Sequence, residues 1–222
     1  MKTVRFIGDV HGKFDRYKKL IKDVDSSRQV GDFGVGFFYP SGIPMTNPPH
    51  DSIMKGDHKY IRGNHDNPKV SAQQKYWIRD GSIEMIEGVK VMYVGGAFSV
   101  DKEWRTEGLD WWEDEELPYK ELYELIDLYA SEKPDVLVTH DGTNEITEVI
   151  EQVSRRRKLQ FGSRTRDALS SMYTYHRPKL HIFGHWHYDL DYVENGTRHV
   201  CLAELSHMDV SFNKGMVVPL KE

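Results

Sequence analysis

The stretch Val4-Arg5-Phe6-Ile7-Gly8-Asp9-Val10-His11-Gly12 decides the fold class of this 222-residue chain. It starts as a short apolar run that ends at a glycine, which is typical of a buried strand. A polar turn follows, and the apolar residues of 14–24 then recur at helical spacing. Strand, turn and helix in this order form the opening unit of an α/β fold. We therefore expect an α/β protein.

The same pattern of an apolar strand followed by a polar turn recurs to the end of the chain. No internal repeat and no change of composition marks a boundary, so residues 1–222 are predicted to form a single domain. We expect further strands near residue 30 and over 60–61, 83–86, 89–94, 136–138, 180–183, 188–193 and 197–202, and further helices over 122–129, 146–153 and 165–173.

Composition and charge restrict the class of protein. Hydrophobic residues make up 38% and charged residues 29%, as in ordinary soluble globular proteins. The net charge of −5 argues against attraction of the whole surface to nucleic acid or an anionic membrane. No apolar run approaches the roughly 18 residues that span a bilayer, and no targeting segment is visible. The one cysteine, Cys201, cannot form an intramolecular disulfide, which favours a reducing, cytoplasmic compartment.

Side chains that bind metal ions follow the predicted strands. Ligand sites of α/β sheets form at the carboxyl ends of strands, so turns that are distant in the sequence are expected to converge. Carboxylate with imidazole suits a first-row transition ion or zinc better than calcium, and a single cysteine excludes a thiolate-rich zinc site. The candidates at these strand ends are Asp9, His11, Asp32, Asn64, His65, His140, His185 and His187.

Each candidate alone also has a purely structural interpretation. A strand-end aspartate is more often a turn or helix cap, a lone buried histidine is usually hydrogen-bonded core, and Asn64 suits a left-handed turn. The His185-x-His187 pair is a stronger signal, because residues two apart in an extended chain project to the same side. Chance convergence of all these residue types at strand ends is much less probable than a site.

Five ordered motifs resemble those of the calcineurin-like metallophosphoesterases, and together they span nearly the whole chain. The segment 95–101, followed by Trp111-Trp112, resembles one common in bacterial and phage members. The resemblance implies a four-layer αββα sandwich of two mixed β-sheets flanked by helices. The motifs are Gly8-Asp9-Val10-His11-Gly12, Gly31-Asp32-Phe33-Gly34, Gly63-Asn64-His65-Asp66, Thr139-His140 and Gly184-His185-Trp186-His187.

The resemblance also implies a two-metal centre that hydrolyses phosphate monoesters or diesters. Two divalent transition-metal ions, with Mn²⁺ favoured over Fe, Zn, Ni and Mg, would activate a water and neutralise phosphoryl charge. His65 resembles the imidazole that stabilises the transition state or protonates the leaving oxygen. By motif position one ion would be held by Asp9, His11, Asp32 and His187, and the other by Asp32, Asn64, His140 and His185, with Asp32 bridging.

One departure from the family pattern narrows the substrate class. Protein phosphatases of the family and the diadenosine tetraphosphate hydrolases carry an arginine after the bridging aspartate, whereas Asp32 is followed by Phe33-Gly34-Val35-Gly36. The third motif reads Asn-His-Asp, where protein phosphatases have Asn-His-Glu. We therefore rank protein phosphatase activity below general hydrolysis of phosphate monoesters or diesters.

A basic cluster, Arg155-Arg156-Arg157-Lys158, is the main feature outside these motifs, with Arg164 and Arg166 after it. Arg156 and Arg157 are candidates for contacts to an anionic substrate, which would make the protein a nuclease or a nucleotide phosphatase acting on nucleic-acid ends. The alternative interpretation is a solvated helix end, where cations suit the helix dipole. The oligomeric state is left open.

Two further features remain ambiguous. Trp104, Trp111 and Trp112 can stack on nucleobases, but packing of an irregular segment onto the core is favoured. The proline-rich segment 40–49 is either a lid or an idle insertion. A binding scaffold that has lost catalysis is disfavoured, because all eight candidate positions are retained. A nucleic-acid binder is disfavoured by the net acidity.

Overall fold

The computed structural model describes residues 1–39, 41–46, 51, 53–154 and 162–219. The elements in chain order are β1 (Lys2–Ile7), α1 (Phe14–Ile21), β2 (Ser26–Gln29), β3 (Asp57–Tyr60), α2 (Pro68–Ser71), β4 (Ile83–Ile86), β5 (Val89–Val94), two short 3₁₀ turns (Lys102–Trp104 and Glu113–Glu115), α3 (Tyr119–Glu132), β6 (Val136–Thr139), α4 (Asn144–Val153), α5 (Arg164–Tyr175), β7 (Leu180–Phe183), β8 (Leu190–Glu194), β9 (Thr197–Cys201), β10 (His207–Asn213) and β11 (Met216–Pro219).

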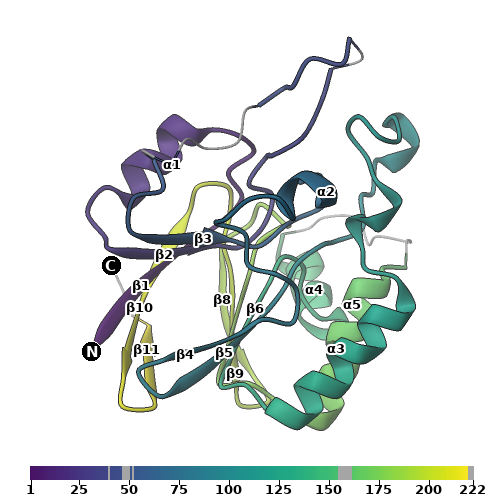
Figure 1. Cartoon of the computed structure of the whole chain (residues 1–222). Helices are drawn as coiled ribbons and strands as arrows, with labels where there is room; N and C mark the ends of the chain where they lie inside the picture. Colours follow the sequence, from purple (N-terminus) through teal and green to yellow (C-terminus); the bar gives the residue numbers. More distant parts are fainter. Residues whose placement is uncertain (40, 47–50, 52, 155–161, 220–222) are drawn as a thin grey trace.

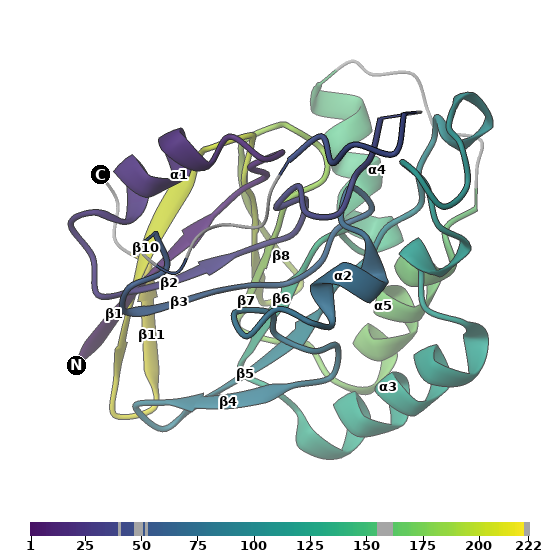
Figure 2. The same cartoon turned by 45° about the horizontal axis from the view of Figure 1, so that its top comes forward.

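These strands form two mixed sheets in the middle of the molecule. One sheet has the order β11-β10-β1-β2-β3, and the other has the order β4-β5-β6-β7-β9-β8. Figures 1 and 2 show α1 on the outer face of the first sheet and α3, α4 and α5 on the outer face of the second. The expected αββα sandwich is thereby confirmed.

Apolar side chains fill the spaces between these layers. Phe6 and Ile182 belong to a buried cluster between the sheets to which both sheets contribute. A second cluster lies under α3 and α5, and includes Leu125 and Leu169. A third lies under α1 and contains Tyr17, whose ring is fully buried. The central strands β5, β6 and β7 are therefore largely buried on both faces, which explains their mostly apolar sequences.

Local sequence signals account for where the long helices begin and end. The hydroxyls of Thr143 and Ser163 accept hydrogen bonds from the first turns of α4 and α5, as helix caps do. Helix α3 ends at Lys133, which adopts a left-handed conformation directly before Pro134. Of the described helices, none combines the length and the apolar composition that a membrane crossing requires.

Parallel pairing in the centre of each sheet positions the site. In the first sheet β1 pairs with β2 and β2 with β3, and in the second β5, β6, β7 and β9 pair in sequence, all in parallel. The carboxyl ends of parallel strands lie at the same edge of a sheet, so the turns that follow them are neighbours.

Two parts of the predicted element pattern were incomplete. No strand was predicted after residue 202, yet β10 pairs antiparallel with β1 from Lys2↔Phe212 to Ile7↔His207, and β11 pairs with β10 at the edge of the sheet. The short helix α2 was also missed. The hairpin of β4 and β5 has the predicted bounds, and α4 and α5 extend one or two residues beyond theirs.

Candidate metal centre

Turns from both sheets meet at the carboxyl ends of their parallel strands. Asp9 follows β1, Asp32 follows β2, Asn64 follows β3, His140 follows β6 and His185 follows β7. Their ligand atoms form two groups that share the carboxylate of Asp32. Residues from opposite ends of the chain thereby lie within a few ångströms of one another, as predicted from the positions of the motifs.

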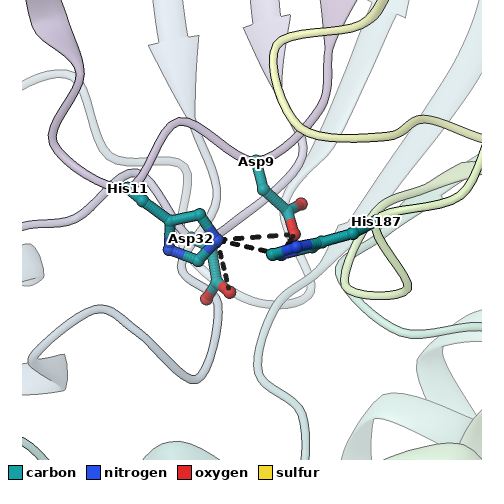
Figure 3. Close-up of side chains that lie close together, drawn as sticks. All are labelled: Asp9, His11, Asp32 and His187. Atoms are coloured by element: carbon teal, nitrogen blue, oxygen red, sulfur yellow. Dashed lines mark hydrogen bonds and ion pairs between the residues drawn. The ribbon is translucent and has the colours of Figure 1, made fainter.

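The first group consists of Asp9, His11, Asp32 and His187 (Figure 3). The Nε2 atoms of His11 and His187 lie 2.9 Å apart, and His187 Nε2 lies 2.9 Å from Asp9 Oδ2. His11 Nε2 is 3.8 Å from Asp32 Oδ2 and 3.9 Å from Asp9 Oδ2. Two imidazole nitrogens and two carboxylate oxygens therefore face one another across a few ångströms.

The second group is built from Asp32, Asn64, His140 and His185. His140 Nε2 lies 3.2 Å from Asp32 Oδ1 and 3.1 Å from Asn64 Oδ1. His185 Nδ1 lies 3.0 Å from the same Asn64 oxygen. Asp32 thus directs Oδ2 toward the first group and Oδ1 toward the second.

Hydrogen bonds behind these side chains fix which atoms face the pocket. His140 Nδ1 lies 2.9 Å from the Val30 carbonyl, which only accepts, so Nδ1 carries a proton and Nε2 presents a lone pair in the neutral ring. The Asn64 amide nitrogen donates to Ser99 Oγ at 3.0 Å, so its oxygen faces His140. Ser99 in turn donates its hydroxyl and its backbone N–H to the buried carboxylate of Glu115. This fixed orientation is typical of the groups behind metal ligands.

Asp66 joins the second and third motifs. Its buried carboxylate accepts backbone N–H bonds from Phe33, Gly34 and Val35 on one side and from Gly63 on the other, at 2.7–3.1 Å. Burial and the neighbouring Asp32 raise the pKa of Asp66 to about 6, against the effect of the backbone donors. The geometry of the two turns therefore depends on one carboxylate that accepts backbone N–H bonds from both of them.

Asp141 joins the fourth and fifth motifs in a similar way. It accepts a hydrogen bond from Trp186 Nε1 at 2.9 Å and is paired with Arg166 of α5 at 3.1 Å. Burial raises the pKa of Asp141, but the guanidinium of Arg166 outweighs it and the net direction is downward. Trp186 lies between His185 and His187, so this pair anchors the turn that carries both histidines.

The backbone at the site adopts conformations that residues other than glycine rarely take. Four of the seven candidate ligands have positive φ: His11 (48°), Asp32 (55°), His185 (67°) and His187 (48°). Such conformations cost roughly 1–3 kcal/mol each and cluster at functional sites. The neighbouring glycines are equally constrained, because a Cβ at Gly63 would lie 2.1 Å from Asp32 Oδ1.

The electrostatics of the pocket favour cations. Burial lowers the pKa of His140, but Asp32 and Asp9 raise it to about 10 overall. Burial raises the pKa of Asp32, and the surrounding histidines bring it well below its usual value. Asp9 Oδ2 is buried and has no aligned hydrogen-bond donor among the described residues, although His187 Nε2 lies close by. Lone pairs and carboxylate oxygens that face one another in this way fit divalent metal ions.

His65 lies beside the two groups and contacts a residue that the sequence did not single out. Its backbone N–H donates to Asp32 Oδ1 at 2.7 Å, and its ring stacks on Phe37 and meets the His11 ring edge-on at 4.9 Å. Its Nε2 lies 2.8 Å from Nη2 of Arg105. Burial, together with the charge of Arg105 and against the effect of Asp32, lowers the pKa of His65 to about 4.

The weaker sequence candidates have mixed outcomes. Arg156 and Arg157 lie outside the described residues. Arg164 donates to the backbone of residues 113–117, and Arg166 is buried against Asp141, so neither faces the metal-ligand groups.

The expectation for the tryptophans is also confirmed for one residue and wrong for another. Trp112 is buried against Phe37, as favoured, whereas the Trp104 side chain is 88% exposed, so the expectation that it packs on the core was wrong. Part of the proline-rich segment 40–49 is described. There Phe38 pairs with Pro44, and residues 41–45 are exposed.

Sequence reasoning missed Ser99, Glu115, Asp141 and Arg105. Ser99 lies in the segment 95–101, which was noted only for its resemblance to other members, and Glu115 is a buried acid that no local pattern reveals. Arg105 lies in an irregular stretch, so its position depends wholly on tertiary packing.

Comparison with known proteins agrees with this fold. A family model described as calcineurin-like phosphoesterase matches residues 2–189. A putative 5′-nucleotidase from Staphylococcus aureus is 13% identical over 99% of this chain and 53% of its own, with a TM-score of 0.52. GAP50, the anchor in the inner membrane complex of Plasmodium, is 10% identical over 99% of this chain and 84% of its own, with a TM-score of 0.50. At these identities the two structures show the fold alone. No curated protein matches the sequence.

Proposed function

The chain belongs to the calcineurin-like phosphoesterase family, and on that premise we propose that it hydrolyses phosphate monoesters or diesters with a two-metal centre built from seven side chains. Its class, a metal-dependent phosphoric ester hydrolase, follows from the family. The proposal adds the two ions and their ligands. The observation that carries it is the position of the Asp32 carboxylate, which directs one oxygen to each group of candidate ligands.

The proposed ligand sets follow the two groups in the structure. Asp9, His11, Asp32 and His187 would hold one ion, and Asp32, Asn64, His140 and His185 the other. When bound, the ions supply Lewis acidity that activates a water and offsets charge on the phosphoryl group. The donor set of imidazole, carboxylate and amide supports Mn²⁺, with Fe, Zn, Ni and Mg as alternatives.

The protein's own groups orient the reactants. Positive φ angles and buried hydrogen bonds hold the ligand side chains in place before any substrate arrives, which limits the reorganisation needed during reaction. We propose that His65, which contacts Asp32 and His11 but lies in neither ligand group, assists the transition state or the leaving oxygen.

A panel of substrates tests the proposed function. The manganese-supplemented protein is assayed against paired aryl phosphate monoesters and diesters, then against nucleotides and oligonucleotides. Asp32→Asn should abolish turnover, whereas Asp15→Asn, on the exposed face of α1, should leave it unchanged. If the wild type hydrolyses none of these esters, or if Asp32→Asn is as active as the wild type, the proposal is wrong.

Nucleotides or nucleic-acid ends are a second candidate substrate class. The supporting observation is Trp104, which is largely exposed on the same segment that brings Arg105 to His65 and offers a surface for base stacking. In this case Trp104→Ala should raise KM for nucleotides and leave KM for aryl phosphates unchanged. Arg156→Ala and Arg157→Ala should also raise KM for nucleotides if the basic cluster contacts them. We further propose a reducing, cytoplasmic location, because the single cysteine, Cys201, is a buried free thiol.

A further inference from the structure

The turn after the bridging Asp32 has no arginine, but the structure brings one to the site from a distant segment. We propose that Arg105 binds the phosphoryl oxygens of the substrate and that His65 holds its guanidinium in place for that contact. This inference rests on the proposed function, because it assigns a residue to the substrate side of the same site. It differs from the ligand assignment in that Arg105 belongs to none of the five motifs.

Arg105 is separated from the candidate ligands by a single side chain. Its Nη2 lies 2.8 Å from His65 Nε2. His65 itself donates its backbone N–H to Asp32, and its ring touches that of His11. A phosphoryl group seated between the ligands and His65 is therefore within reach of the guanidinium.

The direction of the hydrogen bond between Arg105 and His65 shows which of the two residues can donate to a substrate. A guanidinium only donates, so His65 Nε2 accepts and carries no proton in this arrangement. The N–H groups available at this position are then those of Arg105, not one on His65 Nε2. Arginine also suits phosphate, because its planar fork can donate two parallel hydrogen bonds.

The guanidinium of Arg105 retains donors for an anion, because its hydrogen bonds to described residues engage three of its five N–H groups. The Arg105 side chain is only 9% exposed, and its ion-pair partner within the described part of the chain is Asp101 at 2.8 Å, which is itself 51% exposed. In addition to the Nη2 contacts with His65 and Asp101, Nη1 donates to the backbone carbonyl of Asp110 at 3.2 Å. A nearly buried cation with a single solvated counter-charge is a suitable receptor for a phosphoryl oxygen.

The segment that carries Arg105 is docked firmly against the site. Phe38 donates its backbone N–H to the Leu109 carbonyl at 2.9 Å, and the Phe37 ring packs edge-on against Trp112 at 5.0 Å. Phe37 also stacks on His65. The guanidinium is thus positioned before substrate binds, which is what an electrostatic contact to a transition state requires.

Other arginines near the site are held in different contacts. Arg62 pairs with Asp80 and donates to the carbonyls of residues 114 and 115, while Arg166 pairs with Asp141. Among the described arginines, Arg105 is therefore the one whose guanidinium lies within hydrogen-bond distance of the His65 ring.

The test compares Arg105→Ala and Arg105→Lys with the wild type in the manganese-loaded protein. The matched control is Lys120→Ala, which removes one exposed cation from α3. Two quantities are measured: kcat/KM for aryl phosphates whose leaving groups differ in acidity, and the affinity for inorganic phosphate by calorimetry. We expect Arg105→Ala to lose about 10²-fold or more in kcat/KM, as when one preorganised donor to a transition state is removed.

Further readouts separate contact with the phosphoryl group from a structural role. The loss should be similar for all leaving groups, phosphate affinity should fall, and the manganese content should stay at the wild-type value. Added guanidinium ion should restore part of the activity of Arg105→Ala, and Arg105→Lys should be intermediate. Because His65 acts through Arg105, the double variant with His65→Ala should lose less than the sum of the single effects.

Several results would overturn the inference. Activity of Arg105→Ala close to that of the wild type, unchanged phosphate affinity, loss of manganese, or a loss that grows with the basicity of the leaving group would each do so. The last result would assign Arg105 to the leaving oxygen instead. A wild type that hydrolyses no ester would count against the proposed function, and the phosphate affinities of wild type and variant would still decide the role of Arg105.

Discussion

Asp32 and His65 lie side by side, yet their geometry gives them different roles. Asp32 directs its two carboxylate oxygens to two groups of ligand atoms, whereas His65 contacts Asp32 only through its backbone N–H and turns its ring toward Phe37 and Arg105. A residue shared by both groups should control metal content. A residue outside both groups should control turnover alone.

The first prediction at this scale follows from that difference. Asp32→Ala should remove both ions, while His65→Ala should keep both and lower kcat by about 10²-fold or more, because Arg105 loses the side chain that positions it as a donor to the transition state. Metal content per chain is measured by elemental analysis, and kcat is measured on the same samples. Loss of the ions from His65→Ala would show that His65 is a ligand or holds one in place.

Residue patterns show what the sequence can and cannot predict about the site. The residues of both candidate ligand groups could be picked out from the sequence, because they stand in five motifs in which a glycine or threonine precedes a metal-binding side chain. Ser99 and Glu115, which hold Asn64, were not predictable, because their hydrogen bonds join segments that no local pattern relates. Arg105 was not predictable for the same reason.

At the scale of elements, helix α5 supports the fifth motif through a single buried ion pair. Arg166 lies in the first turn of α5 and pairs with Asp141, which follows His140 and also accepts from the Trp186 indole. Asp141 is fully buried and Arg166 nearly so. The position of the turn that carries His185 and His187 therefore depends on a helix outside the pocket.

The second prediction concerns this pair. Arg166→Met should destabilise the fold by about 3–5 kcal/mol, because it leaves a buried carboxylate without its counter-charge. The double variant Arg166→Met with Asp141→Asn should recover part of that loss. Urea unfolding of the metal-free protein measures both, with Arg16→Met on the exposed side of α1 as the control. Equal stability of Arg166→Met and the wild type would mean that the pair does not anchor the helix.

The strands differ in how far local sequence could reveal them. Strands β5, β6 and β7 are continuous apolar runs because both of their faces are covered, and they were predicted. Strand β10 reads His-Met-Asp-Val-Ser-Phe-Asn and is only partly buried, so its sequence is ambiguous. Its place in the sheet is set by pairing with β1 about two hundred residues away, which a local pattern cannot show.

At the scale of the whole molecule, the fold keeps two histidines without charge on the helix-covered side of the second sheet. His181 of β7 contacts the hydroxyls of Thr139 and Tyr173, and the ring of His199 on β9 lies 5.6 Å away. Both are fully buried, and neither ring nitrogen of His199 has a hydrogen-bond partner among the described residues. Burial lowers the pKa of His199 to about 4 and that of His181 well below its usual value.

These depressed pKa values predict that stability falls in acid. Below pH 6.5 the unfolded chain takes up protons at both histidines, whereas folded His199 does so only near pH 4. The contribution of the neutral ring to stability is therefore complete above pH 6.5 and is lost between pH 6.5 and 4. For His199 this amounts to about 3 kcal/mol, at 1.36 kcal/mol per pKa unit. Since Asp66 titrates in the opposite sense over part of this range, a variant must isolate the effect.

The third prediction therefore concerns the slope of the free energy of unfolding against pH. In His199→Phe, which removes the titrating ring from a buried aromatic cluster, the free energy of unfolding should fall less steeply from pH 6.5 to 4 than in the wild type. Tyr175→Phe, at an exposed position on α5 and without a titrating imidazole, should keep the wild-type slope. Urea unfolding at half-unit steps of pH, with chelator present throughout so that metal release does not contribute, measures all three proteins. A slope in His199→Phe as steep as that of the wild type would show that the folded protein already protonates His199 near pH 6.5, and that the interior beneath α4 and α5 is accessible to charge.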